Sequence, residues 1–189
     1  MSDISLSMTN LQKEERGTFR PMRRKKQELA KETCIEILRK GTSGVLALEG
    51  DGGYPYAVPL SYVYDGNKIY FHCARSGHKL DAIRRNPRAS FCVIEQDEIV
   101  PEEYTTYFRS VIIFGTVRIM EEDDGMRKAI RKLAEKYAPD DEAANRQKAI
   151  DRDWGILCML EMDIEHMSGK EAIELVKAKA AKAEVEAGE

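Results

Sequence analysis

The chain contains no long apolar run, and this absence excludes a helical membrane span, which needs roughly 18–20 consecutive apolar residues. Positive charge is not in excess either. The formal net charge is −3, so the chain has no overall basic field that would hold nucleic acid. The opening segment, MSDISLSMTNLQKEERG, lacks the apolar core of a signal peptide. We therefore expect a cytoplasmic protein with neither nucleic acid nor membrane as a partner.

Cysteine and histidine are scarce, with four and three copies. The cysteines are Cys34, Cys73, Cys92 and Cys158, and they form no Cys-x-x-Cys pair. We expect free, mostly buried thiols in a reducing compartment. His72, Cys73 and His78 have a spacing that fits no common zinc motif, and a second ligand pair is missing, so we predict no metal site.

Hydrophobic residues make up 42% of the 189 residues and charged residues 33%, which suits one soluble domain. Residues 1–20 are polar without a period, and we interpret them as a flexible arm. We place the folded domain at 21–178 and a frayed tail at 179–189. The basic cluster RPMRRKK at 20–26 could contact nucleic acid or acidic lipid, or could simply be a solvated helix start.

Short apolar runs separated by turn residues predict six strands, at 44–49, 54–64, 68–73, 89–94, 107–120 and 155–167. Helical periodicity predicts helices at 27–39, 76–86 and 124–137, partly at 138–153, and after the capping-box pattern Ser-x-x-Glu at 168–171. The acidic residues 95–106 are expected to form a loop. Since strands and helices do not alternate regularly, the pattern indicates a mainly β protein, an antiparallel barrel with added helices.

Two strands have unusual composition. The strand at 54–64 contains Pro55 and Pro59, which cannot donate hydrogen bonds to a ladder. This strand therefore lies at an edge, carries a bulge, or offers its backbone to something other than a strand. The strand at 107–120 is apolar on both faces around 111–114, which predicts that both faces are covered.

The segment HCARSGHKLDAIRRNPRASF gathers imidazole and positive charge where a helix begins. Ser76 and Gly77 stand at the predicted helix start, and His78 and Lys79 lie in its first turn. Positive side chains there oppose the helix dipole unless an anion is present, and the free N–H groups also favour an anion. The pattern predicts a phosphate site. The alternative is that Lys79 is a solvated lysine on a helix face.

Three segments together resemble a known family: AVPLSYVYDGNKIYFHCARSGHKLDAIRRNPRASF, YFRSVIIFGTVRIM and MDIEHMSGKEAIELV. They are similar to the FMN-binding split barrels of the pyridoxamine 5'-phosphate oxidase-like family, and within it to the nitroimidazole-resistance (nitroreductase-like) subgroup. The resemblance covers about residues 20–178. It implies a six-stranded antiparallel split barrel that binds FMN and forms a homodimer with flavin between the subunits.

The resemblance also implies site residues. The isoalloxazine would lie along the strand that contains Tyr56, Ala57, Val58, Pro59, Leu60 and Ser61. His72 and Cys73 would line the ribityl chain and phosphate, and His78 and Lys79 would hold the phosphate. His72 is the implied catalytic residue. Arg109 and Trp154 are the candidates for reaching the flavin across the dimer.

The implied function is that of an FMN-dependent oxidoreductase, which reduces a nitro-aromatic or similar small acceptor with electrons from a nicotinamide donor. Pyridoxamine 5'-phosphate oxidases carry an Arg-Lys pair where His78 and Lys79 stand, and a C-terminal substrate motif that this chain lacks. We therefore do not expect vitamin B6 oxidation. A flavin store or sensor without turnover, and a haem or deazaflavin binder on the same fold, stay open as alternatives.

Overall fold

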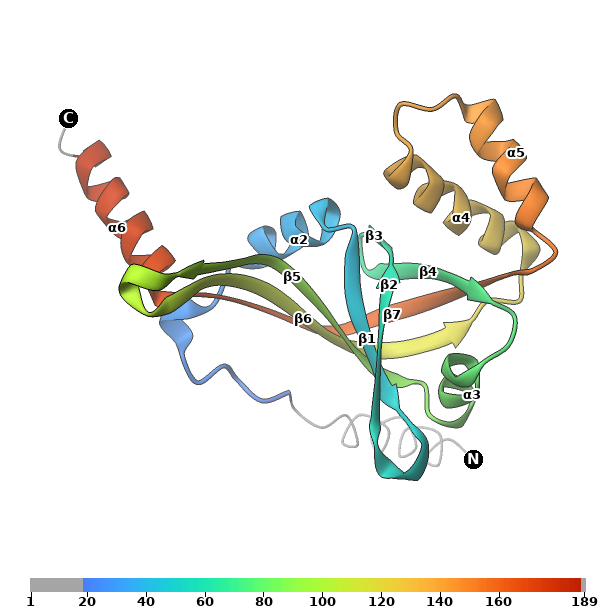
Figure 1. Ribbon diagram of the computed structural model, residues 1–189, viewed down its shortest axis with the longest axis horizontal. Helices are drawn as coiled ribbons and strands as arrows, with labels where there is room; N and C mark the ends of the chain where they lie inside the picture. The colour runs from blue at the N-terminus through green and yellow to red at the C-terminus, as the bar shows by residue number, and fades with distance from the viewer. Residues whose placement is uncertain (1–18, 188–189) are drawn as a thin grey trace, which may run out of the picture.

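The computed structural model describes residues 19–187 and contains one antiparallel sheet of seven strands. The sheet order is β2-β1-β5-β6-β7-β4-β3 (Figure 1). The strands are β1 (Ser43–Glu49), β2 (Pro55–Ser61), β3 (Val63–Asp65), β4 (Lys68–Ala74), β5 (Arg88–Val100), β6 (Thr105–Ile119) and β7 (Leu157–Glu171). The prediction of a mainly antiparallel β protein with helices is confirmed, but in the described residues the sheet has seven strands rather than six and is not closed into a barrel.

Within residues 19–187, five α-helices and three short 3₁₀ helices accompany the sheet. The α-helices are α2 (Lys31–Lys40), α3 (His78–Arg85), α4 (Asp123–Tyr137), α5 (Ala143–Asp153) and α6 (Ile173–Ala187), and the 3₁₀ helices are η1 (Lys25–Gln27), η2 (Asp51–Gly53) and η3 (Pro101–Glu103). Of the predicted arm, all but the last two residues lie outside the described part of the chain. The proposed domain limits stay predictions.

The extra strand arises because the predicted strand at 54–64 divides at Tyr62. The Tyr62 side chain is fully buried, and its hydroxyl donates to the Leu38 carbonyl at 2.9 Å. On either side of it, β2 pairs with β1 and β3 pairs with β4, at opposite edges of the sheet. Within residues 19–187 no ladder joins these two edges, although β2 approaches β4 across the gap. The strand with two prolines is therefore an edge strand, which is one of the three alternatives that the prolines left open.

The predicted acidic loop at 95–106 is wrong. β5 continues to Val100, and its ladder with β6 runs from Arg88 opposite Thr116 to Val100 opposite Thr105. Figure 1 shows this hairpin extending away from the rest of the sheet toward α6. Most side chains from 94 to 99 are exposed there. A two-stranded arm in water can carry acidic side chains on its surface, so charge alone did not mark the end of the strand.

The predicted capping box at 168–171 is also wrong, because these residues lie in β7 and α6 begins at Ile173. Glu171 is 5% exposed and lies opposite Arg109 in the β6–β7 ladder. Its carboxylate accepts hydrogen bonds from Arg109 and Lys179. The glutamate is thus held by cations and does not cap the helix.

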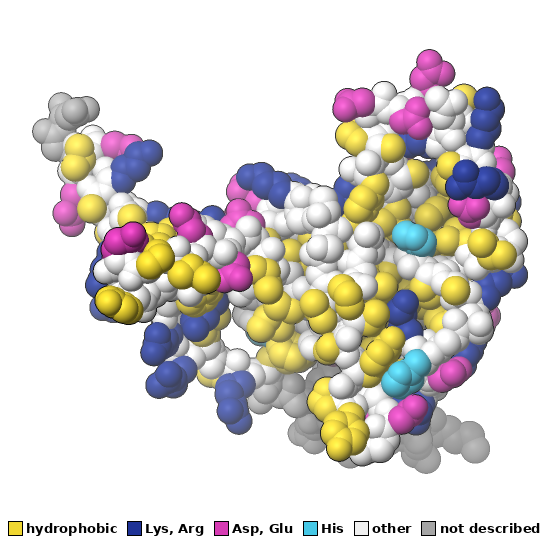
Figure 2. Space-filling view, in the orientation of Figure 1, with side chains coloured by type: hydrophobic (Ala, Val, Ile, Leu, Met, Phe, Trp, Pro, Cys, Tyr) yellow, Lys and Arg dark blue, Asp and Glu magenta, His cyan; other side chains and the backbone are white. Residues whose placement is uncertain are grey.

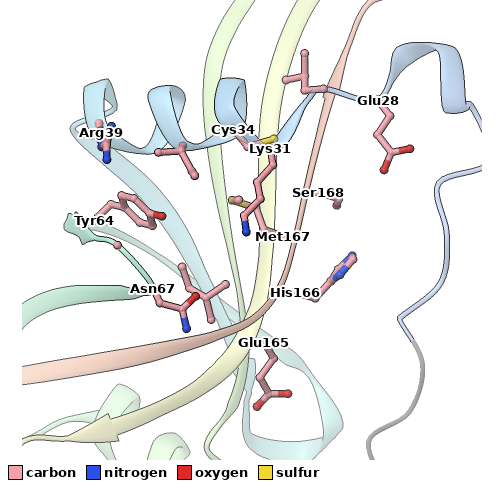
Figure 3. Close-up of a pocket in the computed structure, with 14 residues that line it drawn as sticks. Glu28, Lys31, Cys34, Arg39, Tyr64, Asn67, Glu165, His166, Met167 and Ser168 are labelled. Carbon is pink, nitrogen blue, oxygen red and sulfur yellow. The ribbon is translucent and has the colours of Figure 1, made fainter.

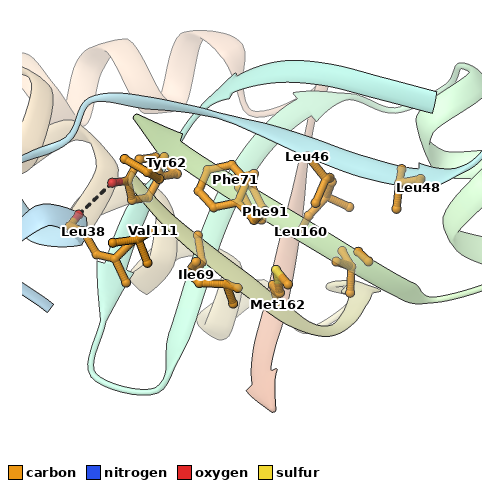
Figure 4. Close-up of a cluster of buried hydrophobic side chains, with 14 of the residues drawn as sticks. Leu38, Leu46, Leu48, Tyr62, Ile69, Phe71, Phe91, Val111, Leu160 and Met162 are labelled. Atoms are coloured by element: carbon orange, nitrogen blue, oxygen red, sulfur yellow. Dashed lines mark hydrogen bonds between the residues drawn. The ribbon is translucent and has the colours of Figure 1, made fainter. Parts of the chain in front are cut away.

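Two apolar clusters hold the fold together. The larger one fills the inside of the curled sheet, and α2 and α3 cover its ends; Figure 4 shows part of it. Its largest fully buried side chains include Tyr62, Phe71, Phe91, Leu46, Ile113, Leu160 and Met162. The smaller cluster joins the other face of β7 to α4 and α5 and contains Met159, Ile130, Leu133 and Ile150. The α4–α5 pair is therefore packed onto the sheet by its own apolar face.

None of the helices described between residues 19 and 187 is both long enough and apolar enough to span a membrane.

Candidate functional site

The predicted anion site lies where β4 ends and α3 begins. The helix starts at His78, and its N-cap is Gly77, one residue after the predicted Ser76. Gly77 has φ +130°, a conformation that side chains rarely adopt, so glycine lets the chain turn directly from strand into helix. The N–H groups of Leu80 and Asp81 bond back to the Gly77 carbonyl. In the described structure those of His78 and Lys79 have no protein acceptor and stay available to a ligand.

Lys79 supplies a positive charge at this helix start. Its side chain is half-buried, and within residues 19–187 it has no acidic partner. Burial is the largest effect on the pKa of both neighbouring groups, lowering that of His72 and raising that of Cys73. The positive charge of Lys79 has a smaller effect and lowers both pKa values. The ammonium group therefore lies near the end of β4. A charged amine close to free N–H groups and without a carboxylate is suited to hold an anion.

His78, the other predicted phosphate ligand, also contacts protein groups. Its Nε2 lies 3.4 Å from Asp51 Oδ2, and its ring stacks on Tyr56 with centroids 4.2 Å apart. Arg85 Nη1 lies 3.1 Å from the other oxygen of Asp51. Asp51 belongs to η2 in the β1–β2 turn, so these contacts fasten that turn to α3. The Nε2 atom of His78 thus faces Asp51, and its role as a phosphate ligand stays a prediction.

His72 and Cys73 are both uncharged at neutral pH. Burial and, to a smaller extent, Lys79 lower the pKa of His72 below its ordinary value of 6.5. Burial raises the pKa of Cys73 to about 11, and the opposing effect of Lys79 is smaller. His72 therefore offers one hydrogen-bond donor and one acceptor, and Cys73 is a thiol rather than a reactive thiolate.

A cavity of about 650 Å³ lies beside His72, between β4 and the α4–α5 pair. Figure 2 shows hydrophobic side chains gathered around this hollow. The lining residues are Ser61, His72, Cys73, Ala74, Ile130, Leu133, Ala134, Tyr137, Ala138, Asp141, Arg146, Ala149, Ile150, Asp153, Ile156 and Leu157. Its size and its mostly apolar lining with a few polar groups are typical of a small-molecule site.

Three predicted residues, Ser61, His72 and Cys73, line this cavity together. The remaining β2 residues alternate along the edge strand. Tyr56, Val58 and Leu60 are half-buried and pack on the larger cluster, and Ala57, Pro59 and Ser61 are exposed. The outer side of β2 has no strand neighbour in the described structure, so its backbone is accessible to a ligand.

Arg109 and Trp154 do not join this group within one chain. Arg109 pairs with Glu171 at 3.2 Å and Glu95 at 3.0 Å, near the distal arm. It is ten residues, or about 33 Å of strand, from Ile119 at the other end of β6. Trp154 packs against the smaller cluster, with the Arg127 guanidinium 4.1 Å from its ring. Neither residue lines the cavity, although Asp153 and Ile156 on either side of Trp154 do, and the assignment of both residues to the flavin stays a prediction.

The wall that α4 and α5 contribute was not identified from the sequence as part of a site. Tyr137 from α4 and Arg146 from α5 both face this cavity. Arg146 Nη1 donates to the Ala138 carbonyl at 3.0 Å and also to the Asp141 carbonyl, and so closes the turn between the helices. The apolar stripe of the helix at 124–137 was visible, but nothing local showed which strand it covers.

A second cavity, of about 630 Å³, lies between α2 and β7 (Figure 3). Lys31 and Arg39 from α2 and His166 from β7 line it, together with Glu28 and Glu165. It contains none of the predicted site residues. We therefore take the cavity beside His72 as the candidate functional site.

One family model matches most of this chain. The family model described as pyridoxamine 5'-phosphate oxidase matches residues 30–171. None of the curated proteins matches the chain.

Solved structures with a similar fold include the following three. An FAD-binding protein of Mesorhizobium loti is 26% identical, with TM-score 0.55 over 77% of this chain and 97% of that one. A candidate 5-nitroimidazole antibiotic resistance protein of Bacteroides thetaiotaomicron is 18% identical, with TM-score 0.63 over 76% and 86%. An FAD- and haem-binding protein of Mycobacterium smegmatis is 22% identical, with TM-score 0.64 over 78% and 73%.

Proposed function

Because this chain belongs to the pyridoxamine 5'-phosphate oxidase family, we propose that it is a flavin-binding oxidoreductase with FMN as its cofactor. The observation that carries the proposal is Lys79, a half-buried cation without an acidic partner in the described chain, next to free N–H groups at the start of α3. A phosphate would satisfy both the lysine and the helix end. His78 Nε2 lies near Asp51, whereas Lys79 has no acidic partner in the described chain, so Lys79 is the principal phosphate ligand in this proposal.

The chain's own residues have distinct roles. Lys79 and the Gly77–Lys79 backbone hold the phosphate, and the exposed edge of β2 at Ala57, Pro59 and Ser61 borders the ring. FMN supplies hydride transfer between a nicotinamide donor and an electron-poor acceptor. The apolar walls of α4 and α5 exclude water from the cavity and suit a flat, uncharged acceptor such as a nitro-aromatic. His72, neutral at pH 7, donates a hydrogen bond to that acceptor.

The identity of the cofactor is open to a direct test. The Mesorhizobium loti protein binds FAD, and the Mycobacterium smegmatis protein binds FAD and haem. The absorption spectrum of the purified protein, followed by the mass of the released cofactor, distinguishes the possibilities. We expect flavin bands and the mass of FMN. A Soret band or a deazaflavin mass would contradict the proposal.

The phosphate assignment is tested by exchanging Lys79 for alanine. A hydrogen bond to a charged group contributes roughly 1.5–3 kcal/mol, so Lys79→Ala should weaken FMN binding by about one to two powers of ten. Riboflavin has no phosphate, and its affinity should hardly change. Arg84→Ala is the matched control, because Arg84 is an exposed cation at the far end of α3 paired with Asp81 at 3.0 Å. Flavin fluorescence quenching measures all of these affinities.

Equal weakening of FMN and riboflavin, or no weakening of either, would show that Lys79 does not hold the phosphate. Turnover is tested separately by adding NADPH to the flavin-loaded protein without oxygen. Bleaching within seconds, followed by recovery when a nitro-aromatic is added, supports a reductase. A flavin that stays oxidised would favour the alternative of a store or sensor.

The protein's partner in this proposal is a second copy of the chain. Val45, Ile112 and Phe114 are 37–41% exposed on the outer face of the sheet. Val45 lies opposite Cys92, and Cys92 lies opposite Ile112, so β1, β5 and β6 present one apolar row. A second copy would cover this row by an interface in which the same patch contributes from each side.

A further inference from the structure

Cys73 and Cys158, far apart in the sequence, lie opposite each other in the β4–β7 ladder. Both side chains belong to the face of the sheet that packs on the larger apolar cluster. Cys158 is 7% exposed, and Cys73, near the open end of β4, is half-buried. The fold thus assembles a thiol pair that the spacing of the cysteines along the chain does not show.

The pair has the geometry that a disulfide needs. Directly opposed residues of antiparallel strands have Cα atoms about 4.5 or 5.5 Å apart, depending on the type of pair. Disulfides usually span about 4.4–6.8 Å between Cα atoms, so either type of pair falls within range. The Cys158 thiol also lies close enough to contribute to the raised pKa of Cys73, after the larger effect of burial.

The other two cysteines provide an internal contrast. Cys34 is buried in α2 beside Gly169. Cys92 lies on the opposite side of the sheet, facing Val45 and Ile112. Within the described structure, neither has a thiol in the facing position of a ladder.

We propose that Cys73 and Cys158 are a redox pair that a peroxide oxidises to an intramolecular disulfide. Burial keeps most of Cys73 protonated, so the small thiolate fraction of this more accessible sulfur attacks one peroxide oxygen slowly. The O–O bond breaks, the sulfur becomes a sulfenic acid, and the other oxygen leaves as water. The Cys158 sulfur then attacks the Cys73 sulfur and displaces a second water. Two thiols and one hydrogen peroxide give one disulfide and two waters.

This inference does not depend on flavin binding, because the two strands face each other in the protein without a ligand. The disulfide would nevertheless affect the candidate functional site. Cys73 is the neighbour of His72 and lines the same cavity, so the disulfide would fix the end of β4 at the candidate functional site.

Trypsin makes the test direct, because each cysteine falls in its own peptide. Cys73 is in residues 69–75 and Cys158 in 153–170, and Cys34 and Cys92 are in 32–39 and 89–109. The full-length protein is treated with hydrogen peroxide, unfolded in N-ethylmaleimide and digested. We expect a mass equal to peptides 69–75 and 153–170 less two hydrogens, which disappears on reduction. Thiols titrated in denaturant should fall from four to two per chain.

Cys73→Ser and Cys158→Ser should each abolish the linked peptide, and the double variant Cys34→Ser/Cys92→Ser should keep it. Methionine sulfoxide in the same digest shows that the peroxide reached the protein. If methionines are oxidised and the wild-type chain still yields no linked peptide, the proposal is wrong. A link through Cys34 or Cys92 would equally overturn it.

Discussion

His72 lies at the point where burial and a neighbouring charge act on the same proton. Burial of the His72 ring and, to a smaller extent, the positive charge of Lys79 disfavour the imidazolium. The pKa of His72 is therefore below 6.5. We expect Lys79→Met to raise the pKa of His72 toward 6.5, because it removes the charge and keeps an apolar stem of similar length. The titration of the His72 Cε1–H resonance measures this, with Arg84→Met as control. An unchanged pKa in Lys79→Met would place the ammonium too far away to act on the ring.

The lowered pKa of His72 also makes the stability of the fold depend on pH. The unfolded chain binds a proton at His72 below pH 6.5, while the folded protein binds it only at lower pH. Folding is therefore disfavoured as the pH falls below 6.5. Lys79→Met should reduce this loss of stability, as measured by urea unfolding at pH 5 and pH 7.

Glu161 is the most buried carboxylate of an ion-pair network, with 3% of the residue exposed. Burial alone would raise its pKa, but hydrogen bonds from Lys68 at 2.5 Å and Arg118 at 2.8 Å outweigh this and lower it. Glu161→Gln leaves two cations without their partner and should destabilise the protein by about 1–3 kcal/mol at pH 7. Urea unfolding measures this, and Asp163→Asn, at a half-exposed position in the same network, should cost less.

The pKa of Glu161 is lowered in the folded protein, so its stabilising effect is present above pH 4.5 and is lost as the pH falls through the folded value. The difference between wild type and Glu161→Gln should therefore shrink in acid. A difference that stays constant between pH 7 and pH 3 would show that the charge of Glu161 is not what stabilises the fold.

Among the elements, the β6–β7 ladder contains an irregularity that only glycine permits. The register shifts between Phe114 and Gly115, and a Cβ at Gly115 would lie 2.0 Å from the Asp163 carbonyl oxygen. Gly115→Ala must push two backbones apart, and we expect a loss of about 2–4 kcal/mol in the free energy of unfolding. Gly155→Ala is the control, since a Cβ there meets no atom within 4 Å. Equal stability of the two variants would mean that the bulge can move.

The elements best predicted from the sequence were those bounded by turn residues. The turns at 50–53 and 65–67 separate strands as expected, and β2 lies at an edge, one of the three alternatives that its prolines allowed. The errors have physical causes. The distal part of β5 is solvated and acidic, so hydrophobicity could not reveal it. Glu171 matched a capping pattern but is held by Arg109 and Lys179.

The candidate site was predictable where its chemistry is local and not where it depends on folding. The charge conflict at Lys79 is contained in one short segment and was visible in the sequence. No local sequence pattern marks the features that join residues from separate elements. These are the cavity wall formed by α4 and α5, the contact of Asp51 with His78, and the pairing of Cys73 with Cys158. Which of these residues hold a flavin stays a prediction.

The whole molecule presents the apolar row of Val45, Ile112 and Phe114 to solvent. We expect light scattering to give twice the 21.5 kDa chain mass. Ile112→Asp would place a charge in the row and should give monomers with weaker flavin binding. Val185→Asp, at a 67% exposed position in α6, should leave the assembly intact. A flavin-loaded wild-type monomer would contradict both the dimer and a site shared between subunits.

The division at Tyr62 has a consequence for how the native protein opens. β5, β6 and β7 are paired on both sides, and β2 and β3 on one side only. Amide hydrogens of the central strands should therefore exchange with solvent slowest, through global unfolding, and those of the two edges earlier, through local fluctuations. Because β2 and β3 meet at Tyr62, its buried hydrogen bond to Leu38 restrains both edges at once. Loss of that hydroxyl would release the two sides of the gap as one cooperative unit.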